Sequence, residues 1–195
     1  MNAQFFVVAI VTVWALSIAV AGIAPGDANA YHRAVKANKL DRLRKLTVQD
    51  TSGLNHQGPG LQSPVMFAAL QGNAEAVRIL IDAGADLTVG EKDGYTVVHG
   101  AGFQGRADVL RVLHEKGVDL NDRNHRDGFT GLHRACWGQS PAHAQTVRVF
   151  LELGVDPNQK AADGRTCGEM SSNHATKQVL EAFFRDKEER QKQEL

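Results

Sequence analysis

The sequence predicts an all-α protein, a solenoid of about five stacked helix-turn-helix repeats preceded by an N-terminal hydrophobic helix. Three features that repeat in the same order along the chain indicate this fold, and the first two recur at a nearly constant period of 33 to 36 residues. The first is a polar residue suited to cap a helix, at Asn29, Ser63, Thr96, Thr130 and Thr166. The second is a small residue five positions later, at Ala34, Ala68, Ala101, Ala135 and Ser171. The third is a glycine exit, as in Gly84-Ala85-Asp86, Gly117-Val118-Asp119 and Gly154-Val155-Asp156.

Residues 93–121 show how one repeat is built. Asp93-Gly94 supplies a turn whose glycine can take a positive φ, and Thr96 follows at the N-cap of a first helix. Gly100 and Gly102 in that helix allow another helix to approach closely. A second helix then carries an apolar stripe at Val109, Leu110, Val112 and Leu113. Neither helix can bury its apolar face alone, so the repeat needs neighbours.

The chain divides in order into a leader, a linker, the repeats and a tail. Residues 1–24 are a signal peptide or signal anchor, and residues 25–28 are a linker with Pro25 and Gly26. The repeat domain covers residues 29–186, as 29–55, 56–88, 89–121, 122–159 and 160–186, and residues 187–195 are a charged tail. Repeat four has three extra residues near 139–142, which we assign to the turn between its helices. Repeat five has a more polar first helix, as expected of a terminal repeat.

These features resemble the ankyrin repeat family, whose turn ends in D-G-x-T-P-L-H-x-A-A and whose helix pair ends in G-A-D-x-N. The resemblance covers about residues 29–184. The family's proline is present only as Pro64, its histidine only as His32, His99 and His133, and Leu61 replaces the turn glycine of repeat two. The resemblance implies a non-catalytic protein-interaction scaffold, which binds a protein or peptide partner through its concave groove and finger turns.

The leader and the last four residues predict the compartment. Residues 5–24 carry no charge, and Ala19-Val20-Ala21 matches a signal-peptidase site better than Ala28-Asn29-Ala30, because the second cut removes the Asn29 cap. Lys192-Gln193-Glu194-Leu195 resembles the K-D-E-L retrieval signal, or simply ends a solvated charged helix. We therefore expect a protein of the endoplasmic reticulum lumen. The alternative is a single-pass membrane protein with an uncleaved N-terminal anchor, because the apolar segment is long and no Lys or Arg precedes it.

Composition and cysteine positions limit the chemistry. The formal net charge is zero, so nothing indicates a nucleic-acid partner, and a membrane would be reached only through the N-terminal segment. Cys136 lies six residues past its cap and Cys167 one residue past the next cap. With helices stacked about 10 Å apart, their Cα atoms would exceed the roughly 7 Å limit of a disulfide, so we expect two free thiols.

One group of residues could support catalysis. His133 and Cys136 lie three residues apart on one helix, and His143 lies in the nearby insertion, which could activate a thiolate or begin a zinc site. We favour a structural interpretation, because His133 occupies the family's recurrent histidine position and no further cysteine has zinc-ligand spacing. We expect no catalytic residue, no cofactor and no metal.

A partner-binding surface is the functional prediction. Leu70, Phe103 and Trp137 recur seven residues past the cap, and Tyr95 and Phe129 recur one residue before it, which predicts an apolar and aromatic strip across repeats two to four. Polar candidates around this strip are Gln71, Lys92, Asp93, Gln104, Arg126, Asp127 and Arg165. Two other functions remain open: a membrane-tethered assembly or spacer protein, and a thiol-dependent enzyme centred on Cys136.

Overall fold

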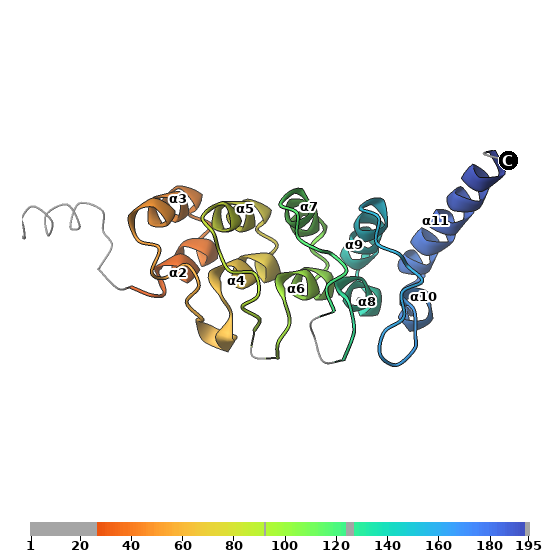
Figure 1. Cartoon of the computed structure of the whole chain (residues 1–195), viewed down its shortest axis with the longest axis horizontal. Coiled ribbons are helices and arrows are strands. Elements are labelled where there is room, and N and C mark those ends of the chain that lie inside the picture. Colours follow the sequence, from red (N-terminus) through yellow and green to blue (C-terminus); the bar gives the residue numbers. More distant parts are fainter. Residues whose placement is uncertain (1–26, 92, 124–126, 194–195) are drawn as a thin grey trace, which may run out of the picture.

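The computed structural model describes residues 27–91, 93–123 and 127–193, and within these ranges its regular structure is entirely helical (Figure 1). The predicted hydrophobic segment of residues 5–24 lies outside the described residues, as do Lys92 and Arg126. Among the described helices, none combines the length and the apolar character that crossing a bilayer requires. The predicted fold class is confirmed for the repeats.

Helix pairs stack into two parallel rows (Figure 1). The inner row contains α2 (Ala30–Lys36), α4 (Pro64–Gln71), α6 (Val97–Phe103), α8 (Gly131–Trp137) and α10 (Cys167–Met170). The outer row contains α3 (Leu40–Gln49), α5 (Ala74–Asp82), α7 (Ala107–Glu115), α9 (Pro141–Glu152) and α11 (His174–Gln193). Each helix packs against its own partner and against the next helix of its row. We call the segment that leads from one outer helix to the next inner helix a finger and give it the number of the repeat that it enters. The second finger, between α3 and α4, contains the short 3-10 helix η1 (Pro59–Leu61).

The recurring cap residues begin the inner helices, but their side chains do so in different ways. Thr130 and Thr166 form capping boxes, with His133 and Glu169 respectively as the reciprocal partners. The Ser63 hydroxyl accepts a hydrogen bond from the Met66 N–H. The Thr96 hydroxyl instead bonds the ring of His99, and the Asn29 side chain makes no capping bond. Asn29 thus marks the start of α2 without stabilising it as a cap.

Glycines bring α6 and α8 into backbone contact, as the small residues predicted. A methyl group on Gly102 would overlap the carbonyl oxygen of Gly131, and one on Gly131 would lie within 2.8 Å of the Val98 side chain and carbonyl oxygen. Both positions therefore exclude any side chain. This close contact holds the third and fourth fingers next to each other.

The three extra residues of repeat four do not lengthen its turn, so that prediction was wrong. Only residues 138–140 separate α8 from α9, whereas α9 has 12 residues against nine in α5 and α7. Pro141 explains the difference, because proline is well suited to the first turn of a helix. The insertion therefore extends α9 at its N-terminus.

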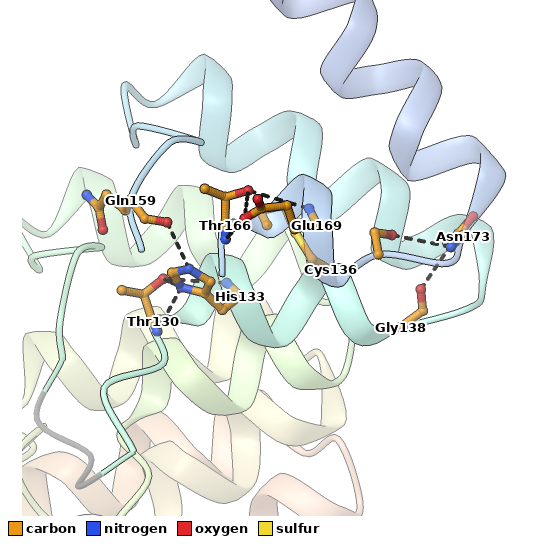
Figure 2. Close-up of a disulfide and its surroundings, with 10 residues drawn as sticks. Thr130, His133, Cys136, Gly138, Gln159, Thr166, Glu169 and Asn173 are labelled. Carbon is orange, nitrogen blue, oxygen red and sulfur yellow. Dashed lines mark hydrogen bonds between the residues drawn. A yellow bond between two sulfur atoms is a disulfide. The ribbon is translucent and has the colours of Figure 1, made fainter. Parts of the chain in front are cut away.

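The prediction of two free thiols is also wrong, because Cys136 and Cys167 form a disulfide between α8 and α10 (Figure 2). Their Cα atoms are 5.5 Å apart. The limit of a disulfide applies to the distance between Cα atoms, which is shorter than the distance between the helix axes. Because each Cα lies about 2.3 Å from its helix axis, facing Cα atoms of helices about 10 Å apart come within about 5–6 Å. The bond fastens the terminal repeat to the stack.

Candidate partner-binding site

Arg134 on α8 lies at the centre of an aromatic cluster built from two fingers and one inner helix. Its guanidinium carbon lies 4.5 Å from the ring centroid of Tyr95, 5.0 Å from that of Phe129 and 4.7 Å from that of Trp137. Attraction between a cation and the faces of aromatic rings stabilises such an arrangement. We call Arg134, Tyr95, Asp127, Phe129 and Trp137 the Arg134 cluster.

The charge of Arg134 is balanced within the cluster. Only 6% of Arg134 is exposed, and its Nη2 pairs with the Asp127 carboxylate and donates a 3.0 Å hydrogen bond to the Tyr95 hydroxyl oxygen. A buried cation is costly unless it is paired and hydrogen-bonded, so these two contacts make its burial possible. Because Tyr95 belongs to the third finger and Asp127 to the fourth, Arg134 fixes the two fingers to each other.

The predicted apolar strip is partly at the surface. Phe103, at the end of α6, is 56% exposed, whereas Leu70 and Trp137 are half-buried. Tyr95 is half-buried under Arg134. Phe129 is only 9% exposed, because its ring packs on Trp137 at a centroid distance of 4.9 Å and on Ala161 and Met170. Phe129 therefore supports the surface from below.

The polar candidates surround this strip unevenly. Gln71, Asp93 and Gln104 are exposed, and Asp127 is half-buried against Arg134. The exposed Arg165 pairs with Asp163 within its own finger, outside the Arg134 cluster. Lys92 and Arg126 lie outside the described residues. The structure thus brings Leu70, Asp93, Tyr95 and Phe103 together around one hollow of about 280 Å³ on α6, which we call the α6 pocket.

Histidines on three of the inner helices, α2, α6 and α8, connect their repeats to the following finger. His99 Nε2 lies 2.8 Å from the Phe129 carbonyl oxygen, and its Nδ1 lies 2.8 Å from the Thr96 hydroxyl. A carbonyl oxygen only accepts, so Nε2 of His99 carries a hydrogen. His133 binds the Gln159 carbonyl oxygen with Nε2 and accepts from the Thr130 N–H with Nδ1 (Figure 2). The His133 ring is therefore held in the neutral tautomer with hydrogen on Nε2.

Burial lowers the pKa of His133 below its usual value of 6.5, although its hydrogen bond to the Gln159 carbonyl acts in the opposite direction. Burial also lowers the pKa of His32, whose Nε2 bonds the Gln62 carbonyl oxygen. His143 bridges Ser140 and the Phe103 carbonyl oxygen. These histidines hold the stack together, which agrees with the structural interpretation of His133.

A thiol-dependent enzyme centred on Cys136 would need a free thiol, and neither cysteine has one. Cys136 is fully buried and its sulfur is bonded to that of Cys167, so neither residue can supply the thiolate that a nucleophile needs. Within residues 27–91, 93–123 and 127–193, no group of three or more His, Cys, Asp or Glu side chains is arranged to hold a metal ion.

Comparison with known families agrees with the stacked helix pairs. The family model for ankyrin repeats (3 copies) matches residues 31–124 and 65–161, which together cover most of the chain. The chain belongs to the ankyrin repeat family. Ankyrin repeats are protein–protein interaction scaffolds, and the family is generally non-catalytic.

Two curated proteins are similar to part of this ankyrin chain. They are the Notch-regulated ankyrin repeat-containing proteins of Homo sapiens and Mus musculus. Each is 29% identical over 83 residues, which is 41% of this chain and 73% of the relative. The similarity covers less than half of the chain.

Sequence reasoning missed Arg134 and Glu91. Arg134 occupies a variable position of the ankyrin inner helix, four residues past the cap, where the other repeats have Arg33, Phe67, Gly100 and Met170. An arginine between buried Leu132 and Ala135, seven residues after Asp127, was the available signal. Glu91 carried no signal, because only the folded finger brings it to the α6 pocket.

Proposed function

We propose that this ankyrin domain is a non-catalytic scaffold that binds a protein or peptide partner across its inner helices and finger turns. The observation that carries the proposal is the exposed Phe103 ring beside the Arg134 cluster. Large exposed aromatic side chains next to rigid, desolvated neighbours are typical of binding hot spots. Candidate contacts are Leu70, Gln71, Lys92, Asp93, Tyr95, Phe103, Gln104, Arg126, Asp127, Phe129, Trp137 and Arg165.

Preorganisation is the mechanism that we propose for binding. Arg134 links two fingers, and the Gly102–Gly131 contact fixes the inner helices beneath them. A partner that binds to such a surface loses its own freedom but orders little of the scaffold. The cost of association is correspondingly low.

A charge placed at Phe103 tests this function. We expect Phe103→Glu to weaken capture of partners from cell extract by at least about tenfold, because a carboxylate cannot enter an apolar contact without losing its hydration. Val48→Glu is the matched control, since Val48 is 86% exposed on the outer helix α3. Quantitative mass spectrometry of captured proteins is the measurement. If folded Phe103→Glu captures the same proteins as wild type, this binding face is wrong.

We also propose that the protein works in an oxidising compartment, the endoplasmic reticulum lumen. The Cys136–Cys167 disulfide supports this location, because such bonds persist in oxidising compartments and are rare in the cytosol. Alkylation of free thiols in intact cells, followed by mass spectrometry, should find the two cysteines bonded, and alkylated Cys136 and Cys167 would contradict the proposal. A mature N-terminus at Gly22 would indicate a cleaved leader, and one at Met1 the membrane-anchored alternative.

A further inference from the structure

The α6 pocket has an apolar end and an acidic end. Leu70 and Phe103 line it where α4 and α6 finish, and Glu91 and Asp93 line it from the finger that precedes α6. Its volume of about 280 Å³ lies at the lower limit of small-molecule sites, which span about 300–1,000 Å³. The pocket therefore matches one or two side chains of a peptide better than a cofactor.

The interior of the pocket contributes little charge. Gly100 leaves the floor without a side chain, and both ring nitrogens of His99 are already bonded to Thr96 and Phe129. Arg134 lines the wall, but Asp127 balances its charge and three aromatic rings cover it. The Gln62 side-chain amide, a neutral donor, bonds Glu91 at 3.3 Å, so this contact leaves the negative charge of Glu91 in place.

We propose, on the basis of the function proposed above, that the α6 pocket selects a peptide segment with one large apolar side chain followed or preceded closely by Lys or Arg. The apolar side chain packs between Leu70 and Phe103, where it covers the exposed ring of Phe103. The basic side chain pairs with the carboxylate of Glu91 at the other end. Complementary charge of this kind sets orientation and association rate more than it sets affinity.

The length of α6 fixes the spacing of the two side chains. Seven helical residues span about 10 Å, and an extended peptide rises about 3.3 Å per residue. The basic residue should therefore lie about two to four positions from the apolar one.

Selection from a display library of random short peptides on the full chain tests the inference. We expect enriched peptides to carry a large apolar residue and Lys or Arg at that spacing. A synthetic copy of an enriched peptide should bind the Glu91→Lys variant about tenfold more weakly at about 50 mM salt, and this difference should shrink at about 500 mM salt because ions screen exposed charges. Glu181→Lys, on the exposed face of α11, is the matched control and should bind like wild type.

The outcomes separate this inference from the function on which it rests. Enriched peptides that lack a basic residue, or that bind Glu91→Lys as well as wild type, overturn the inference. If such peptides still lose binding to Phe103→Glu, the proposed binding face stands. The absence of any enriched peptide overturns the inference as well. If Phe103→Glu also captures the same proteins as wild type, the proposed binding face fails too.

Discussion

At the residue scale, buried polar side chains connect neighbouring repeats. Asp127, the Tyr95 hydroxyl and three aromatic faces replace part of the hydration of buried Arg134, whose Nε has no hydrogen-bond partner among the described residues. His32, His99 and His133 each donate a hydrogen bond from Nε2 to a backbone carbonyl oxygen of the following finger. The charge state of these side chains is therefore part of the stability of the stack.

Acidification should destabilise the domain as the pH falls through about 6.5. Burial keeps the pKa of His32 and His133 below 6.5 in the folded state, whereas the unfolded chain takes up protons near that pH. Because the unfolded state then binds more protons, this stabilisation is complete above about pH 6.5 and is lost below it. Urea unfolding at about pH 7.5 and 5.5 should show a lower midpoint at the acidic pH.

Titration of carboxylates should not contribute to a difference in urea midpoint between about pH 7.5 and about pH 5.5. Hydrogen bonds lower the pKa of Asp50, Asp86, Asp163 and Glu169, so their contribution is lost only when the pH falls below the usual carboxyl range near 4. A His133→Gln variant should unfold more easily at about pH 7.5 and should respond less to pH. Equal urea midpoints at the two pH values in wild type would contradict the histidine explanation.

At the element scale, the contact between α6 and α8 determines how the two central fingers are arranged. Gly102 and Gly131 meet backbone to backbone, so the axes of the two helices approach more closely than side chains would permit. The aromatic residues of adjacent repeats then reach the same arginine. The shape of the candidate site depends on these two glycines.

Gly102→Ala should destabilise the fold by about 1–3 kcal/mol, because the added methyl group overlaps the Gly131 carbonyl and forces the helices apart. Thermal and urea unfolding measure this loss. Gly168→Ala is the control: it too is helical, but its new methyl group would meet only the Leu180 side chain at 3.7 Å. That variant should match or slightly exceed wild-type stability, since alanine favours helix more than glycine does. A wild-type midpoint for Gly102→Ala would show that the helices separate without cost.

At the scale of the whole molecule, stability comes from each repeat packing on its neighbours, so the terminal repeats have the least support. At the C-terminal end this weakness is conspicuous, because α10 contains only four residues. The Cys136–Cys167 bond compensates by joining α10 covalently to α8 (Figure 2). The last repeat is therefore kept in place by a bond as well as by packing.

Removal of the disulfide should lower the free energy of unfolding by about 3–4 kcal/mol, the chain-entropy value for cysteines separated by 31 residues. In the double variant Cys136→Ala/Cys167→Ala, hydrogen exchange in α10 and α11 should be faster than in wild type, and this increase should be larger than the increase in α6. Reductant should destabilise wild type and leave the double variant unchanged. If hydrogen exchange in α10 and α11 of the double variant stays at the wild-type rate, packing alone is sufficient to hold the last repeat on the stack, and the disulfide does not stabilise it.

The architecture of the repeats can be predicted from local sequence patterns. Caps at a period of 33 to 36 residues, small residues on the inner helices and glycine exits specify helix pairs that must stack, because each unit leaves an apolar face uncovered. They also placed Tyr95, Phe103 and Trp137 at positions that share one face. These patterns are local, so they can be recognised in the sequence without the distances between packed helices.

Features that depend on the distance between repeats could not be predicted from these patterns. The 5.5 Å approach of Cys136 and Cys167, and the burial of Phe129 beneath Trp137, follow from how closely successive inner helices pack. The use of Arg134 to join two fingers depends on the same distance. A periodic pattern fixes which residues face each other, whereas the separation is set by the smallest side chains between the helices, which for α6 and α8 are Gly102 and Gly131.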